Sequence, residues 1–369
     1  MVLDVQKKIE YVGKLAVLGF LALMAYSPKL WITEKDFPVI PRFDFIPIPS
    51  YPFDYILVFT LISLLVIFFF KQKKIVGLSI TILYFYLAMV DQNRLQPYFY
   101  QSILSIFFIS FYKNDSKSKT IVLHSLMLLF LATYFFSGIH KINENFNSVW
   151  MHAFSKHFGF LPEIVRYLFT RSVPFIEAII ALFLLFNKTR KIGVIGIVTM
   201  HLGIVTLLLV FGYGFNVIPW NLQNILSVIL LFWQYKSENA LELFSKYFNY
   251  KKAIVILLVF LLPFSNLVGF WDHLLSFSFF SAKLNYYYIE INDEDLLTNL
   301  PENVKKQIYT FEGKNIINFN DWAGIVNGVL FYPEDRVAYK TQKYIESFST
   351  KTNNENLTKL VEYHHRKVR

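Results

Sequence analysis

The chain has 369 residues, of which 55% are hydrophobic and only 17% are charged, and its mean hydropathy is positive. Soluble domains usually carry about 25% charged residues. Here, long apolar stretches alternate with short Lys-rich segments up to residue 271, which indicates a multi-span membrane protein and excludes one large soluble core. Cysteine is absent, which excludes disulfides, thiolate nucleophiles and Cys-ligated zinc or iron–sulfur clusters.

The first apolar stretch, YVGKLAVLGFLALMAYS, lacks a clear small-residue cleavage site, so it predicts a membrane span rather than a cleaved signal peptide. Eight further apolar stretches follow. Some of them are shorter than the ~20 residues that a perpendicular crossing needs. The nine predicted spans are residues 11–27, 53–70, 75–92, 95–112, 120–139, 172–187, 192–211, 217–235 and 253–270.

Lysine and arginine are concentrated in every second break between these spans. The basic segments are QKK near the start, KQKK, KNDSKSK, NKTRK and the segment that ends in YKK. By the positive-inside rule, the N-terminus is cytoplasmic and the residues after 271 lie outside, and we expect the plasma membrane of a bacterium. The net charge of +10 is mostly loop lysine and indicates no nucleic-acid partner.

Three segments outside the spans have a character of their own. Residues 28–52 carry six prolines interleaved with aromatic residues, which predicts an extended flap. Residues 140–171 are amphipathic and predict helices that lie along the outer surface. The polar residues 272–369 include an alternating stretch, AKLNYYYIEIND, that is typical of a strand. The predicted fold class is therefore an all-α multi-span membrane bundle, residues 1–271, with a small C-terminal α/β extracytoplasmic domain, residues 272–369, that ends in a basic helical tail.

Ionisable residues are costly at membrane depth, so each of them needs an explanation. Lys141 lies at the outer end of the fifth span, where the residues alone favour an interfacial anchor over a functional role, and His140 beside it has the same two interpretations. Glu177 lies about one turn inside the outer interface, where carboxylates usually face the bundle interior and pair. His201 falls near mid-span in the seventh helix, where packing and functional roles are about equally favoured.

Further polar residues surround the outer ends of the third, fourth and eighth spans. Asp91 and Arg94 follow the third span, where their simplest role is helix capping and a local Asp–Arg pair. Tyr98 comes next, and Trp220 and Asn221 open the eighth span. These groups project to the outer third of the bundle, whereas the inner third has few ionisable residues. That distribution predicts one outward-facing ligand pocket rather than a path through the membrane.

The histidines do not form a compact zinc motif. His140, His152 and His157 are spaced 12 and 5 residues apart, and His364–His365 lies in a basic tail. No P-loop, GxGxxG or GxSxG motif is present in the sequence. We therefore expect no metal site.

The stretch LATYFFSGIHKINENFNSVWMHAFSKHFGF resembles the central signature of the HTTM family, the horizontally transferred transmembrane domain, which includes the vitamin K-dependent γ-carboxylase. The resemblance continues through MHLGIVTLLLVFGYG and fades at WDHLLSFSFFSAKLNYYYIEI, so it covers about residues 75–290. In the carboxylase, the motif lysine is the base that deprotonates vitamin K hydroquinone. The resemblance implies that role for Lys141, positioning or proton-relay roles for His201 and Glu177, and reduced vitamin K or another quinol as cofactor.

The sequence also departs from the carboxylase. Tyr98 stands where the carboxylase carries a histidine, its cysteines are absent, and fewer than 100 residues replace its large luminal portion. These departures argue against carboxylation of a propeptide-tagged protein. A pocket for a quinol, or the fold alone, remains as the expectation.

Two functions stay open at this point. The first is a membrane protein that binds a quinol or another lipid-like ligand in its outer leaflet, including a quinol-dependent epoxidase or carboxylase-type enzyme with Lys141 as base. The second is a non-catalytic binding, immunity or assembly factor, in which Lys141 is an interfacial anchor and the external domain contacts a protein partner. Transport is disfavoured because the inner third has few ionisable residues.

Overall fold

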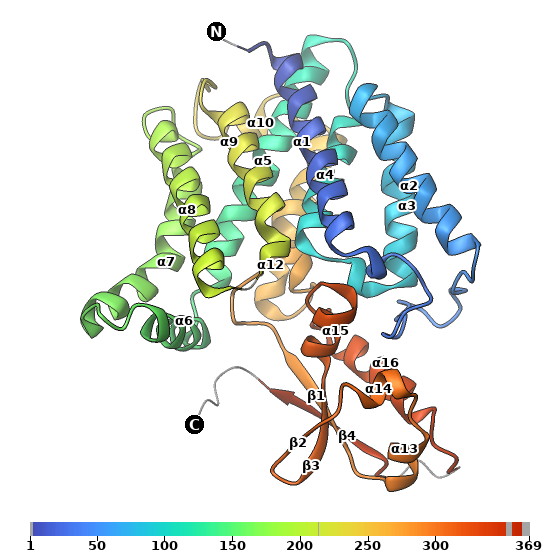
Figure 1. Ribbon diagram of the computed structural model, residues 1–369. Helices are drawn as coiled ribbons and strands as arrows, with labels where there is room; N and C mark the ends of the chain where they lie inside the picture. Colours follow the sequence, from blue (N-terminus) through green and yellow to red (C-terminus); the bar gives the residue numbers. More distant parts are fainter. Residues whose placement is uncertain (1–2, 213, 352–355, 364–369) are drawn as a thin grey trace.

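The computed structural model describes residues 3–212, 214–351 and 356–363. Figure 1 shows a bundle of helices with a small sheet domain beneath one of its ends. We call that end of the bundle the domain end and the other end the opposite end. The chain enters at the opposite end and runs first toward the domain end (Figure 1).

The bundle is built from apolar helices that follow one another closely along the chain. Their bounds are α1 Val5–Tyr26, α2 Phe53–Phe70, α3 Lys74–Val90, α4 Pro97–Ile109, α5 Ser116–His140, α6 Glu144–His157, α7 Glu163–Phe183, α8 Arg190–Phe211, α9 Ile218–Phe232, α10 Glu242–Ser245, α11 Tyr250–Ile256 and α12 Leu262–Ser265. A π-helical stretch, Leu257–Leu261, makes α11 and α12 one continuous rod.

Six helical segments within the described residues are long and apolar enough to cross a membrane. They are Val5–Tyr26, Phe53–Phe70, Ser116–His140, Arg190–Phe211, Phe215–Phe232 and Tyr250–Val268. This bears out a multi-pass membrane protein, but the predicted count of nine spans is not confirmed. The other three predicted spans fall on α3 and α4, which are shorter apolar helices, and on α7, which carries several charged residues.

Helix α5 forms the centre of the bundle. It packs against α7, α4, α9 and α11, and almost all of its length is buried. Asp115 begins the helix by accepting a hydrogen bond from the Ser118 backbone N–H at 2.7 Å. The helix ends at His140, and Asn143 then caps α6 by accepting from the Phe146 N–H at 2.9 Å.

The segment predicted to lie along the outer surface divides between two helices. Helix α6 lies across the domain end beside the start of α7, as predicted (Figure 1). Helix α7 differs from the prediction, because it begins at Glu163 and continues through Pro174 to Phe183 without a break. A proline inside a helix removes one backbone donor, yet α7 stays helical through Pro174 where it packs against α5 and α8.

The C-terminal domain contains a four-stranded antiparallel sheet in the order β2-β3-β1-β4. Its strands are β1 Tyr286–Ile291, β2 Tyr309–Phe311, β3 Lys314–Asn318 and β4 Thr358–Tyr363, and its helices are α13 Glu294–Asn299, α14 Glu302–Lys305, α15 Phe319–Asn327 and α16 Asp335–Glu346. The strand predicted around residue 288 is therefore present. The predicted basic helical tail is present only as α16, because residues 358–363 form an edge strand, and His364–His365 lies outside the described residues.

The sheet domain is fixed to the bundle through the polar segment between α3 and α4. Arg336 donates to Gln92 Oε1 at 2.8 Å and also pairs with Asp272. The Tyr332 backbone N–H donates to Asn93 Oδ1 at 3.1 Å. Because the bonds to Gln92 and Asn93 join residues about 240 positions apart in sequence, the domain has a defined orientation on the membrane helices.

Candidate functional site

The candidate site lies where α5 and α7 cross at the domain end. Gly138 permits the crossing: a Cβ atom added there would lie 2.6 Å from the Ala178 nitrogen and 2.7 Å from the Pro174 oxygen. Small residues let helix backbones approach closely in membrane bundles. The glycine in YFFSGIHKIN therefore brings the end of α5 against the part of α7 that carries Glu177.

Lys141 and Glu177 form a buried ion pair across this crossing. The Lys141 Nζ donates to Glu177 Oε2 at 2.6 Å and to Ser137 Oγ at 2.6 Å. The side chains are only 9% and 6% exposed. The interpretation of Lys141 as an interfacial anchor requires its charge to reach water or headgroups, so the low exposure argues against it.

A second polar contact joins α5, α8 and α9. His201 Nδ1 lies 2.7 Å from Asn221 Oδ1, and His201 Nε2 lies 3.1 Å from the Tyr134 hydroxyl. Asn221 uses its amide nitrogen to donate to the Val217 carbonyl, so its oxygen faces the ring. In the neutral imidazole, Nδ1–H then donates to Asn221 and the Tyr134 hydroxyl donates to Nε2.

These two contacts belong to one group of buried polar side chains. Glu177 and Lys141 lie close enough to act electrostatically on His201, and Glu177 likewise acts on Tyr134. We call Tyr134, Lys141, Glu177, His201 and Asn221 the inter-helix polar cluster. It draws on α5, α7, α8 and α9, so the three residues predicted as catalytic are brought together.

Trp220 and Tyr98 lie beside the cluster rather than in it. The Trp220 indole N–H donates to Gln101 Oε1, and Gln101 Nε2 donates to Thr133 Oγ1 and Asn224 Oδ1, each at 3.1 Å. The Tyr98 ring packs against Trp220 with centroids 6.1 Å apart. Phe279 from the segment before the sheet domain covers both rings.

Asp91 and Arg94 are not part of the cluster. Asp91 pairs with Lys35 at 2.6 Å rather than with Arg94, so the predicted local Asp–Arg pair is wrong. Burial lowers the pKa of Lys35, and the Asp91 carboxylate opposes that shift. Arg94 donates to the carbonyls of Leu30, Trp31 and Leu87. Both residues hold the proline-rich segment 28–52 against the bundle, since a buried charge needs such partners.

The opposite end of the bundle also contains buried polar groups, to which the sequence analysis gave no role. His124 Nε2 lies 2.7 Å from the Tyr235 hydroxyl, and Lys252 Nζ lies 3.2 Å from His124 Nδ1. Glu242 accepts from Tyr235 at 3.2 Å, and Arg190 donates to the Tyr235 carbonyl. The end of the bundle that the proposed orientation makes the inner one therefore carries more buried ionisable groups than the sequence analysis expected. The argument against a path through the membrane loses its basis.

One family model matches the region that contains the cluster. Residues 119–232 match the model of MauE, a methylamine utilisation protein. The MauE-like region runs from the start of α5 to the end of α9, which is less than half of the chain, and it includes every member of the inter-helix polar cluster. No curated protein and no solved structure matches the chain.

The match to MauE corrects the expected family. Membership of the HTTM family was inferred from the residues around Lys141, and that inference is wrong, because the matching family is MauE. The carboxylase chemistry implied for Lys141, His201 and Glu177 has no support once the resemblance is withdrawn. What remains is their geometry within a MauE-like membrane region.

The cluster has the chemistry of a site that can move protons or hydrogen-bond a ligand. It combines an ammonium, a carboxylate, an imidazole and a phenol in an apolar environment. Within the described part of the chain, no group of three or more His, Asp or Glu side chains is placed to hold a metal ion. Sequence reasoning missed Tyr134 and Ser137, although their spacing to Lys141, at i, i+3 and i+7, is typical of one helix face.

Proposed function

We propose that this protein binds an amphipathic, lipid-like ligand whose polar head meets the inter-helix polar cluster in the MauE-like region. The proposal rests on one observation, the buried Lys141–Glu177 ion pair between α5 and α7. The ligand head carries hydrogen-bonding oxygens, as a quinone or quinol does. The match to a methylamine utilisation protein supports a membrane role but names no ligand for this chain.

The burial of the Lys141–Glu177 ion pair costs desolvation free energy, and this cost argues for a functional role of the pair. Apolar side chains of similar volume often hold two helices together as well as, or better than, a buried ion pair, because both charges lose their hydration. In membrane helices such residues generally mark sites of binding or proton movement. His201 adds to this, since it places a second titratable group beside the same pair.

The test identifies lipids that co-purify with the protein. The wild type, Lys141→Met and the control variant Lys156→Met are purified in mild detergent, and bound lipids are identified by mass spectrometry. Lys156 is an exposed lysine on α6, so its change controls for loss of one charge. We expect an enriched quinone-like lipid in the wild type and the control and its loss in Lys141→Met. Equal lipid content in all three samples would contradict the proposal.

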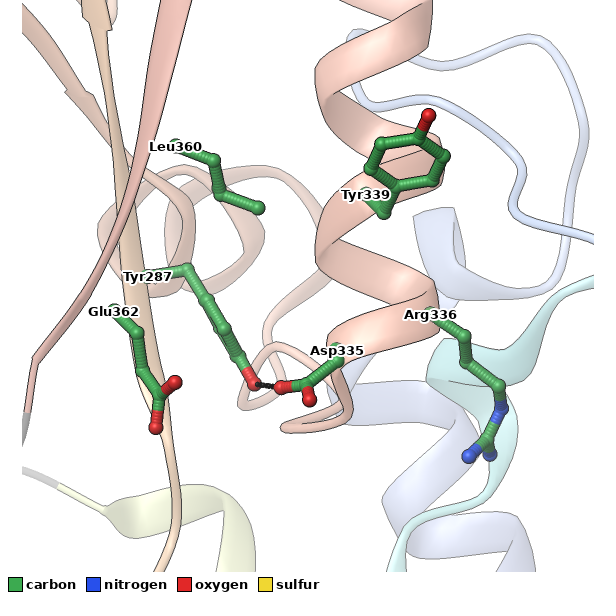
Figure 2. A pocket seen from close by; sticks show the side chains of 6 residues that line it. All are labelled: Tyr287, Asp335, Arg336, Tyr339, Leu360 and Glu362. Atoms are coloured by element: carbon green, nitrogen blue, oxygen red, sulfur yellow. Dashed lines mark hydrogen bonds between the residues drawn. The ribbon is translucent and has the colours of Figure 1, made fainter.

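A second candidate function, a binding or assembly factor, is favoured by a cavity in the sheet domain. The cavity has a volume of about 510 Å³ and lies among β1, β4 and α16, lined by Tyr287, Asp335, Arg336, Tyr339, Leu360 and Glu362. Figure 2 shows the Tyr287 hydroxyl directed at Asp335, a contact of 2.5 Å, while Arg336 points away from it. An exposed segment of a partner protein is the proposed occupant.

The two candidates are separated by complementation of a deletion strain. Binding of a lipid by the bundle alone predicts that Tyr339→Ala, a change at the cavity's exposed rim, leaves function intact and Lys141→Met abolishes it. Assembly of a partner predicts the reverse pattern. Loss of function in both variants would mean that the bundle and the sheet domain act together.

A further inference from the structure

His140 occupies an environment that the inter-helix polar cluster does not explain. Its side chain is 2% exposed, and neither ring nitrogen has a hydrogen-bond partner of ordinary geometry among the described residues. The Ser276 backbone lies near the ring, which would occupy at most one of the two nitrogens. Buried polar atoms are almost always satisfied, so a buried imidazole with a free nitrogen indicates a missing partner.

The segment that covers His140 comes from the junction with the sheet domain. We call residues 274–283 the aromatic loop. Asn143 Nδ2 joins it to α5 by donating to the His140 carbonyl at 2.8 Å and to the Ser281 carbonyl at 3.0 Å. Three residues of the loop that are not glycine, Phe277, Phe280 and Ala282, have φ values between 51° and 59°. Such a backbone is costly, and the structure around the loop has to hold it in place.

The charges around His140 are mainly positive. Lys283, His273 and Lys141 all lie close enough to act on its ring. Two of these have an acidic partner, since Lys141 pairs with Glu177 and His273 Nδ1 lies 3.2 Å from Glu334 Oε1. Lys283 is half-buried and has no acidic partner within ion-pair distance in the described parts of the chain. Among the described residues, its ammonium donates to Asn266 Oδ1 at 3.4 Å.

A further donor lies in the same junction. Asn266 donates to the Trp271 carbonyl, and the Trp271 indole N–H is buried without a partner in the described residues. A partnerless indole N–H and an imidazole that can donate need an acceptor, and the nearby ammonium without a counter-ion favours an acceptor that carries negative charge. A second cation would be disfavoured here by the same three groups.

We infer that the junction between the end of α5 and the aromatic loop binds a phosphate-bearing anion, with His140 and Lys283 as its ligands. The junction lies at the domain end of the bundle, and the same phosphate chemistry is offered by an acidic lipid headgroup and by free phosphate. His140 stacks on Phe136 and faces the aromatic loop, whereas Lys141 faces α7, so this site is separate from the Lys141–Glu177 pair. This anion site goes beyond the proposed function, and the two proposals are tested independently of each other.

The test uses the full-length protein and two sources of phosphate. Purified protein in nanodiscs of phosphatidylglycerol or phosphatidylcholine is examined by native mass spectrometry for retained lipid. Inorganic phosphate is titrated in detergent, with thermal unfolding as the readout. His140→Leu and Lys283→Met are compared with His152→Leu and Lys156→Met, which make the same changes at exposed positions of α6.

We expect His140→Leu and Lys283→Met each to weaken retention of the anion roughly tenfold, as the loss of one charge-assisted hydrogen bond does, and the control variants to retain it. Retention of phosphatidylglycerol with no response to inorganic phosphate assigns the anion to a lipid. A response to inorganic phosphate that is independent of the lipid assigns it to a soluble ligand. No retention from either source, or equal retention in all variants, overturns the inference. If His140→Leu does not fold, His140→Asn and Lys283→Met carry the test.

Discussion

At the scale of single residues, the Lys141–Glu177 pair shows a conflict between folding stability, which apolar residues would serve as well, and the proposed binding function, which needs the charges. Glu177→Leu leaves the Lys141 ammonium buried without its carboxylate, and we expect a loss of about 3–5 kcal/mol of stability. The double variant Lys141→Met/Glu177→Leu removes both charges and should recover most of that loss. Thermal unfolding in detergent measures all three proteins.

The control for this series is Glu163→Leu, at an exposed carboxylate in the first turn of the same helix. A change there should shift stability by less than about 0.5 kcal/mol. If the double variant were as unstable as Glu177→Leu, the pair would not be the source of the loss. Recovery of stability together with loss of the bound lipid would assign the pair to binding rather than to folding.

Gly138 gives a second prediction at this scale. Gly138→Ala places a methyl group against the α7 backbone, so α5 and α7 must separate, and we expect a cost of about 1–3 kcal/mol. Gly203→Ala is the matched control, because a Cβ there meets nothing within 4 Å on the exposed face of α8. The control should be neutral or stabilising by up to ~1 kcal/mol, since alanine favours helix over glycine. Equal unfolding temperatures for the two variants would refute a close crossing.

At the scale of elements, Arg94 decides whether the proline-rich segment 28–52 stays in place. Three backbone carbonyls accept from its guanidinium, and a lysine ammonium cannot reproduce that planar geometry. We expect Arg94→Lys to release the segment and to accelerate chymotryptic cleavage beside Phe43 and Phe45 on its exposed side. Limited proteolysis followed by mass spectrometry measures the rate at each site.

Arg42→Lys is the control for this prediction. Its guanidinium lies 5.8 Å from the Phe43 ring centre, while its backbone N–H donates to the Met89 carbonyl, a bond that the substitution keeps. We expect nearly unchanged cleavage. Rapid cleavage of the control alone would mean that the segment is held by its own surface contacts and not by Arg94.

The same scale shows how far the sequence could predict the structure. Apolar length and the Pro-rich and amphipathic segments predicted the helical bundle, the flap and α6, because those signals are local. The partners of the charged residues were not predictable in this way. Asp91 pairs with Lys35, 56 residues away, and Tyr134 meets His201 across 67 residues. Such pairs depend on how helices pack, which local periodicity does not encode.

The polar groups at the opposite end were missed for a related reason. His124, Lys252 and Arg190 each lie near the end of a helix, where a sequence interpretation assigns them to water or headgroups. The structure instead buries all three side chains. His124 contacts the Tyr235 hydroxyl, whereas Lys252 and Arg190 donate to backbone carbonyls. For Lys141 the sequence left two interpretations open, and its low exposure argues against the interfacial anchor.

At the scale of the whole molecule, orientation is the property to test. We propose a cytoplasmic N-terminus and an external sheet domain in the inner membrane of a bacterium, because Lys-rich segments occupy the opposite end. The absence of native cysteine makes single introduced cysteines clean reporters. Tyr339→Cys on α16 should react in intact cells with a membrane-impermeant maleimide, and Lys188→Cys between α7 and α8 should react only after lysis.

Labelling of Lys188→Cys in intact cells, with Tyr339→Cys protected, would reverse the proposed orientation. Both positions are exposed, so accessibility to the reagent depends on the side of the membrane and not on burial in the protein. Reaction of both positions in intact cells would place both outside, so an even number of spans would separate them, contrary to the proposed topology. The nine crossings proposed from the sequence place the two on opposite sides.

The central position of α5 has a consequence for biogenesis. During synthesis α5 emerges before α7, α8 and α9. Lys141 is made 36 residues before its partner Glu177, and Tyr134 is made 67 residues before its partner His201. Until those partners are made, the polar groups of α5 are unpaired and face the insertion machinery or lipid, where unpaired polar groups cost free energy. The bundle is therefore expected to leave the translocon as a unit of several helices, and a truncation between α5 and α7 should be a preferred target of membrane proteases.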